Sequence, residues 1–160
     1  MVQARERGTS LRYENFSGAT KHVLIVAQEI AGKLGFETIK SEHILLGLLQ
    51  DLIVQQTLME VLHVNYVIMY LRIGAKIIPI EPKPEVSAKE LSEEVEEIFR
   101  FAIEERGLNQ NGEITPFHML LAIMKQKTGG AREILEEEAQ RNGLNYADAI
   151  KSLVLQKEKP

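Results

Sequence analysis

The amino-acid sequence predicts an all-α fold made of two four-helix repeats related by a pseudo-twofold axis. Three observations support this prediction: apolar residues recur with a helical period, a proline-rich stretch divides the chain, and the two halves repeat each other. The stretch at 79–86 contains three prolines, and no helix interior tolerates them at that density. We therefore expect repeat one at 13–78, a linker at 79–86 and repeat two at 87–156.

The repetition is clearest around two histidines. The segment Ile39–Leu49, IKSEHILLGLL, aligns with Ile114–Met124, ITPFHMLLAIM, at an offset of 75 residues. The same offset continues upstream, where Phe16 falls on Leu91. Downstream the offset grows to 80 at Tyr146, so the second repeat carries five extra residues. A duplication of this length predicts two copies of one supersecondary unit.

The first repeat shows signals for four helices. A helix of apolar sevenfold spacing follows Ser17, a good N-cap, and ends at Gly35. A second begins at Ser41, whose hydroxyl is expected to accept from the N–H groups of its own first turn. A third runs through Leu58 and Leu62. The fourth opens after Asn65 and is expected to extend to about residue 73.

The second repeat has matching helix starts. Ser92 stands where the first repeat has Ser17, Thr115 is followed by Pro116 at the first helical position, and Asn145 matches Asn65. The segment Val64–Ile80 is rich in β-branched residues, so a strand is the alternative there. It is also more apolar than one amphipathic helix needs. We expect it to pack into the seam between the repeats, with an exposed patch for a partner as the alternative.

Composition limits the function. The 160 residues contain no cysteine, which excludes disulfides, thiol nucleophiles and thiolate metal sites. The net charge of −4 argues against a nucleic-acid partner, and no apolar run is long enough for a membrane span. Residues 1–12, expected to be a flexible arm, have no signal-peptide pattern, so we expect a cytoplasmic protein. Residues 157–160 are expected to form a short tail.

No catalytic or cofactor-binding motif is present in the sequence. It contains neither a phosphate-binding Gly-x-x-x-x-Gly-Lys-Ser/Thr loop nor a Gly-x-Ser-x-Gly nucleophile elbow. His43 and His118 lack a third ligand at metal-binding spacing, and we expect each to bond to a backbone carbonyl or across the pseudo-twofold axis. The carboxylates of 104–105 and 136–138 are expected to form solvated helix faces. We therefore predict no enzyme activity, no cofactor and no metal; a small hydrolase rests only on scattered histidines and glutamates.

Taken together, these residues resemble the amino-terminal domain of the Clp unfoldases, the Clp repeat, either as a detached domain of a larger ATPase or as a stand-alone Clp-repeat protein. The resemblance lies in Phe16-Ser17 before the first helix and in Ser41-Glu-His-Ile-Leu-Leu-Gly-Leu, and it covers about residues 13–156. It implies a non-enzymatic module that binds Clp adaptor proteins or unfolded or tagged protein substrates for a Clp ATPase–protease. The alternative is an accessory protein that contacts the Clp ATPase ring or protease core without binding clients.

The resemblance also implies a site. In some members of this family the hydroxyl that caps the first helix and the glutamate of the second hold phosphorylated arginine, and the matching residues are Ser17 and Glu42. A carboxylate suits a guanidinium, and helix N-terminal N–H groups suit a phosphate. In the second repeat Ser92 is present but Phe117 replaces the carboxylate, so we expect no guanidinium pairing there. Ser17 and Glu42 equally fit a structural role in capping helices, the usual role of such residues.

Overall fold

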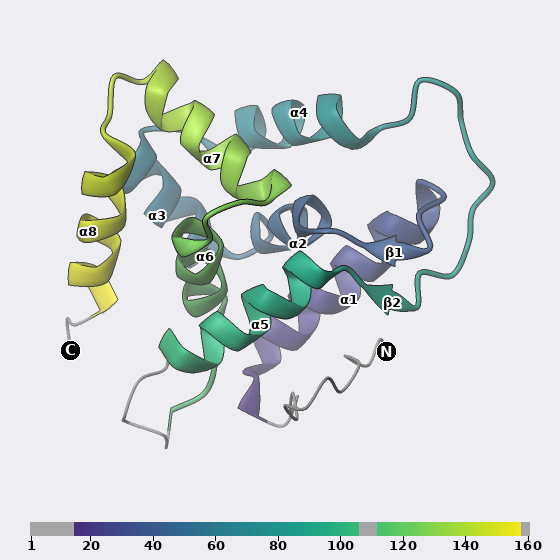
Figure 1. The fold of residues 1–160 in the computed structure, drawn as a ribbon, viewed down its shortest axis with the longest axis horizontal. Helices are drawn as coiled ribbons and strands as arrows, with labels where there is room; N and C mark the ends of the chain where they lie inside the picture. The colour runs from purple at the N-terminus through teal and green to yellow at the C-terminus, as the bar shows by residue number, and fades with distance from the viewer. Residues whose placement is uncertain (1–14, 106–111, 158–160) are drawn as a thin grey trace.

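The computed structural model describes residues 15–105 and 112–157, in which eight helices and two very short strands form one body (Figure 1). The expected arm at 1–12 and the end of the expected tail, 158–160, lie outside the described residues. The elements are α1 Gly18–Lys33, β1 Thr38–Ile39, α2 Ser41–Leu48, α3 Leu52–Leu62, α4 Tyr66–Ile77, β2 Glu90–Leu91, α5 Glu93–Glu105, α6 Pro116–Lys125, α7 Gly130–Arg141 and α8 Tyr146–Lys157.

The two repeats are α1 to α4 and α5 to α8, and their pairing shows the pseudo-twofold symmetry. Ile39 of β1 pairs in parallel with Leu91 of β2, and Phe16 forms an equivalent parallel bridge with Ile114. Adding 75 to Phe16 gives Leu91, and adding 75 to Ile39 gives Ile114. The two bridges are therefore equivalent under the pseudo-twofold symmetry. Each bridge joins the start of a helix from one repeat to the start of a helix from the other. The prediction of two symmetric four-helix repeats is confirmed.

The two bridges were not expected from the sequence, which indicated helices alone. Each bridge involves one or two residues just before a helix. Such a short segment shows no alternation of apolar and polar residues that would predict a strand. Matching backbone hydrogen bonds complete the bridges: Ser17 donates to Ile114 and Ser92 donates to Ile39, both at 3.0 Å. These bonds tie the start of α1 to that of α6, and the start of α5 to that of α2.

The core lies where α2 packs on α1, α6 packs on α5, and the two central helices α2 and α6 meet each other. Both central helices are buried almost along their whole length, which explains why their sequences are nearly continuous apolar runs rather than amphipathic patterns. Gly47 lets α1 and α2 approach closely, since a Cβ there would lie 2.6 Å from the carbonyl oxygen of Val23. The largest fully buried side chains come from both repeats: Phe99, Ile39, Ile44, Leu45, Leu48, Leu49, Leu58, Leu62, Met69, Ile73, Ile98 and Ile114.

Helix caps follow the sequence at most positions. The side chains of Ser17, Asn65 and Thr115 accept from the backbone N–H three residues later, as expected. Asp51 caps α3 in the same way. The prediction for Ser41 is wrong: Lys40 holds the N-cap position of α2, and the Ser41 hydroxyl accepts instead from the N–H of Ala131 in α7 at 3.0 Å. A tertiary contact thus replaces the local cap.

The fourth helix is longer than expected and has two apolar faces. It continues to Ile77, four residues beyond the expected end, because its buried face follows a helical period through Met69, Ile73 and Ile77. The opposite face is exposed. The segment therefore fills the interior with one side only. The expected packing holds for that side, and the alternative of an exposed patch holds for the other.

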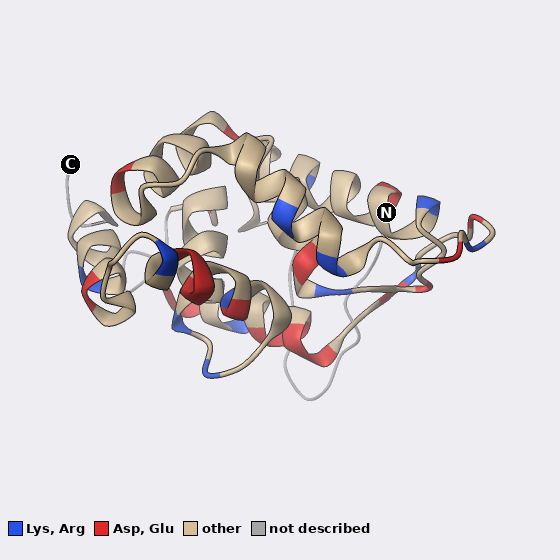
Figure 2. Ribbon diagram, turned by 90° about the horizontal axis from the view of Figure 1, so that it is seen from above, with Lys and Arg blue, Asp and Glu red and all other residues tan. Residues whose placement is uncertain are grey.

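Charged residues occur on most helices, with both signs interspersed (Figure 2). The expectation that the glutamates of 136–138 form a solvated face is wrong for Glu138, and that for 104–105 is wrong for Glu105. Glu138 is 2% exposed and pairs with Arg72 of α4, while Glu105 is 9% exposed and lies 2.6 Å from Lys125. Glu138 and Glu105 are thus each matched by a basic group from another helix.

None of the described helices is by itself long and apolar enough to cross a membrane. Together α2 and α3 have the length and composition, but the two helices meet at 103°.

Candidate functional site

Two carboxylates and a serine meet where α2, α5 and α7 begin. Glu94 Oε1 accepts from the backbone N–H of Ser41 at 3.2 Å and from its hydroxyl at 2.7 Å. The same hydroxyl oxygen lies 3.1 Å from Oε1 of Glu42. Both carboxylates are therefore near one serine, and we call Ser41, Glu42 and Glu94 the acidic cluster. A hydroxyl has one proton, so the shorter contact leaves Glu42 the less satisfied of the two acids.

The start of α7 closes one side of the acidic cluster. A Cβ built on Gly130 would lie 2.4 Å from Cδ of Glu42, so glycine is required for the carboxylate to rest against this helix start. The positive end of the helix dipole stabilises a carboxylate there. Gly129, with φ +133°, precedes the helix and lets the chain turn into it. The two glycines belong to the segment in which the second repeat carries its extra residues.

The acidic cluster also borders a buried amide. Gln126 is 2% exposed, and its Nε2 donates to the carbonyl of Glu94 at 3.0 Å and to Oε1 of Glu97 at 2.9 Å. Its Oε1 has no hydrogen-bond partner and lies close to Gly129. The carbonyl oxygens and carboxylates at this junction are all acceptors, so the site suits a donor-rich cation such as a guanidinium.

His43 and His118 occupy equivalent positions and play equivalent roles. Nδ1 of each accepts from a backbone N–H three residues earlier, Lys40 for His43 and Thr115 for His118, at 2.9 Å in both cases. This differs from the expected bond to a carbonyl, because a neutral imidazole can also accept and the N-cap N–H needs a partner. The two histidines thus share this backbone bond, although His43 is buried and His118 is only partly buried.

The His43 ring is fully buried against Phe36, with 4.9 Å between ring centroids, and its Nε2 has no partner. Burial, and after it the positive charge of Lys40, lower the pKa of His43 from 6.5 to about 4. The imidazole is therefore neutral in the folded protein near pH 7.

This buried histidine predicts a loss of stability in acid. Below pH 6.5 the unfolded chain gains a proton that the folded protein does not bind until about pH 4, so stability falls across that interval. Between pH 7 and pH 5 wild type is expected to lose about 2 kcal/mol more of its unfolding free energy than His43→Asn, whose amide oxygen accepts the same N–H. Urea unfolding at the two pH values measures this difference. Equal losses would show that His43 does not cause it.

The counterpart of the acidic cluster in the other half of the molecule is apolar. By the offset of 75, Ser41, Glu42 and Glu94 correspond to Pro116, Phe117 and Ala19. The Ser17 side chain is used locally, as it accepts from the N–H of Thr20 at 3.1 Å and contacts its hydroxyl. Two symmetry-related places therefore differ in chemistry, one acidic and one apolar.

The structure does not bring Ser17 and Glu42 together. Ser17 lies at the start of α1, beside Ile114, whereas Glu42 follows β1, which comes after the end of that 16-residue helix, about 24 Å long. The capping hydroxyl on the side of Glu42 is that of Ser92, whose N–H donates to Ile39, three residues before Glu42. Ser92 and Glu42 lie on the same side because the start of α5 pairs with the start of α2 from the other repeat. The sequence did not reveal this pairing.

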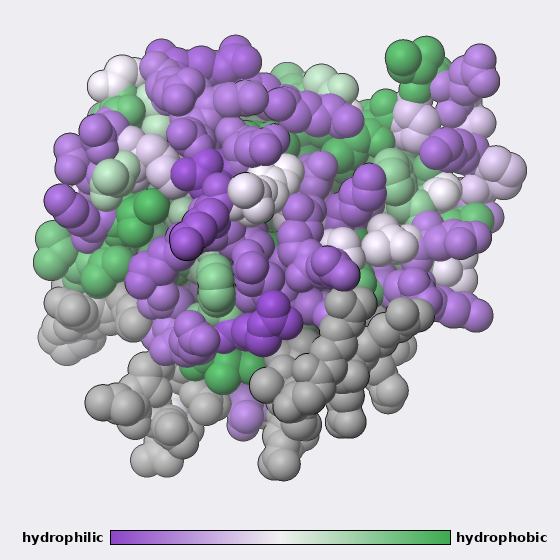
Figure 3. Space-filling model, viewed as in Figure 1, coloured by the Kyte–Doolittle hydropathy of each residue, from purple (hydrophilic) through white to green (hydrophobic). Residues whose placement is uncertain are grey.

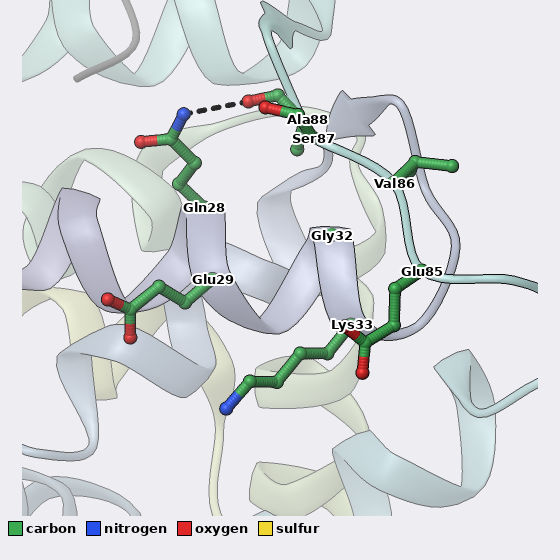
Figure 4. A pocket seen from close by; sticks show the side chains of 8 residues that line it. All are labelled: Gln28, Glu29, Gly32, Lys33, Glu85, Val86, Ser87 and Ala88. Atoms are coloured by element: carbon green, nitrogen blue, oxygen red, sulfur yellow. Dashed lines mark hydrogen bonds between the residues drawn. The ribbon is translucent and has the colours of Figure 1, made fainter.

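A shallow depression of about 540 Å³ lies beside α1, where the segment after the prolines passes over it (Figure 4). Gln28 Nε2 donates to the carbonyl of Ala88 at 2.8 Å, and the N–H of Val86 donates to Gly32 at 2.9 Å. A Cβ at Gly32 would lie 2.4 Å from the Val86 oxygen. These contacts fasten the end of the linker to α1. The lining of the depression carries both charge signs, from Glu29, Glu85 and Lys33, and it does not indicate one class of ligand.

The architecture is thus that of a duplicated helical module. Its candidate site lies where the start of α2 from one repeat meets the starts of α5 and α7 from the other. The sequence matches the model of the Clp repeat (R) N-terminal domain over residues 15–138, and the chain belongs to this family. This confirms the resemblance and the Clp N-domain-like fold. No catalytic domain is found in the chain, and the family is one of non-catalytic modules.

Solved structures with the same fold support this assignment. One, titled as preliminary structural investigations of a malarial protein secretion system, has a TM-score of 0.69 and 20% identity, covering 89% of this chain and 94% of that one. The N-terminal domain of the caseinolytic protease associated chaperone ClpD from Arabidopsis thaliana has a TM-score of 0.62 and 18% identity, covering 92% and 100%. No curated protein matches the chain significantly in sequence.

Proposed function

We propose that the chain is a non-enzymatic protein-binding module that recognises adaptors or substrates for a cytoplasmic Clp ATPase–protease. Membership of the Clp repeat family supports the Clp context. The observation that carries the recognition role is the acidic cluster, in which Glu42 and Glu94 converge on one side of α7. Both side chains are partly exposed, so a client can reach them.

The client group that fits is an arginine side chain, in particular a phosphorylated one. Its guanidinium pairs with Glu42, which has the weaker contact to Ser41, and Glu94 adds a second negative charge beside it. Ser92 supplies the hydroxyl on this side of the molecule. Ser17, placed with Phe117 at the apolar counterpart, is not part of the same pocket.

Glu42→Ala is expected to weaken binding of an arginine-phosphorylated peptide about 10- to 100-fold, since a charge-assisted hydrogen bond contributes about 1.5–3 kcal/mol. Calorimetric titration of the full chain measures the dissociation constant. Glu29→Ala is the matched control, because Glu29 is an exposed glutamate on α1 away from the cluster. Ser92→Ala is also expected to weaken binding, whereas Ser17→Ala is not.

Equal affinity of wild type and Glu42→Ala would reduce Glu42 to a charge at a helix start. The same peptide with unmodified arginine separates the contribution of the guanidinium from that of the phosphate. A pull-down with purified adaptor, ATPase ring and protease core then distinguishes a recognition module from an accessory protein, which would retain the ring or the protease and no client.

A further inference from the structure

The outer face of α4 is apolar and exposed. Val67 is 52% exposed, Ile68 38%, Leu71 69% and Ile78, immediately after the helix, 60%. Its only two charged residues, Arg72 and Lys76, pair with Glu138 and Glu137 of α7, so they lie on the edge of α4 that faces α7. In Figure 3 green surface appears at the upper right, where α4 and the following segment lie. A helix that is apolar on both faces is normally covered on both.

The spacing of the exposed residues is that of a helix-pairing seam. Ile68, Leu71, Ala75 and Ile78 follow one another at intervals of three, four and three, the a and d positions of a heptad. This spacing reads the same in both directions along the helix. An antiparallel copy of the stripe can therefore be laid over it with every apolar position opposed by another.

We propose that the outer face of α4 binds the same face of a second copy of this chain, with the two helices antiparallel about a twofold axis. In that register Leu71 lies opposite Ala75 of the second copy, and Ile68 lies opposite Ile78. Large side chains thus meet small ones at the centre, which is the condition for close interdigitation of two helices. An isologous contact of this kind closes as a dimer.

The charges along the seam are compatible with this pairing. A twofold axis brings equal edges of the two helices together, so the edge with Arg72 and Lys76 meets its own copy. Arg72 pairs with Glu138, and Lys76 Nζ lies 3.1 Å from Oε1 of Glu137. Each edge therefore carries both signs, and no cluster of unpaired like charges opposes association.

Gly74 also fits a close approach. A methyl group at this position would meet only Cδ1 of Ile78, at 3.4 Å, so the interior of a single chain does not require glycine here. Glycine within a helix costs about 1 kcal/mol relative to alanine. Gly74 borders the stripe beside Ala75, and two small residues there let a second helix backbone come near.

The exposed area limits the size of the dimer interface. At about 100 Å² for a fully exposed Leu, Ile or Val side chain, Val67, Ile68, Leu71 and Ile78 together expose roughly 220 Å² of apolar surface. With the usual apolar share of about 60%, two copies bury on the order of 700 Å² in total. Interfaces of this size are weak and reversible, so we expect the dimer to form only at high protein concentration.

Sedimentation equilibrium from about 5 to 500 µM tests the proposal. Wild type is expected to change from monomer to dimer across this range, and Leu71→Glu is expected to remain monomeric with an unchanged helical circular dichroism spectrum. Leu155→Glu is the matched control, because Leu155 is 63% exposed on α8, and this variant is expected to dimerise like wild type. A monomeric wild type at the highest concentration, or a dimeric Leu71→Glu, would overturn the proposal.

The register has a separate test, because the chain has no native cysteine. When Leu71→Cys and Ala75→Cys proteins are mixed under mild oxidation, a disulfide between the two variants is expected to form faster than either homodimeric disulfide. Preferential Leu71→Cys homodimers would overturn the antiparallel register. Neither experiment depends on client binding, so failure here leaves the proposed function to its own test.

Discussion

Replacing Phe99 by alanine is expected to lower the free energy of unfolding by about 3–5 kcal/mol. Phe99 in α5 has no exposed surface, and its ring meets the ring of Phe16 edge-on, with 5.5 Å between centroids and an interplanar angle of 84°. Phe16 is the residue that bridges to Ile114. The variant therefore creates a cavity at the junction of the repeats. Urea denaturation followed by circular dichroism at constant pH measures the loss.

Phe101→Ala provides the control for this prediction. Phe101 lies two residues further along α5 and is only partly buried, so its removal is expected to cost less than half as much. The comparison keeps helix propensity and the chemistry of the substitution constant. Similar losses for both variants would show that burial at the repeat junction does not set the energy.

The helices could be predicted because burial imposes a period on the sequence. The duplication then indicated their order, because the starts of the first, second and fourth helices have counterparts at offsets of 75 or 80. What the sequence lacked was any sign of how the repeats pair. A bridge of one or two residues, such as Phe16 with Ile114, carries no alternation, and the fourth helix, expected to end at about residue 73, continues to Ile77.

The candidate site was harder to predict than the fold. Glu42 was named through the family resemblance, but Glu94 and Gln126 were missed because they come from the other repeat. Gly130 was not predicted to lie at the site, although a glycine pair before a helix could have indicated a close contact. Nothing in the spacing places Ser41 against Ala131, 90 residues away. Charge was equally misleading, because pairing with Arg72 allows Glu138 to be buried on a helix that looks solvated.

Replacing Arg72 by methionine is expected to cost about 3 kcal/mol of stability, because it leaves the Glu138 carboxylate buried without its close partner. The Glu138 side chain is 3% exposed, and the remaining basic group, Arg141 Nε, lies 3.9 Å away on a side chain that is 58% exposed. Lys76→Met breaks the neighbouring pair with Glu137, whose side chains are both 44% exposed. Solvent screens that pair, and this control is expected to change stability by less than about 1 kcal/mol.

A second substitution decides whether the cost arises from the unpaired charge or from lost packing of α4 on α7. Arg72→Met combined with Glu138→Leu removes both charges while keeping apolar volume, and it is expected to recover most of the stability lost in the single variant. If the double variant were as unstable as Arg72→Met, the arginine stem rather than the ion pair would hold α4 in place. Recovery would instead establish that the acidic side chains of α7 are tolerated in the interior only because α4 supplies their counter-charge.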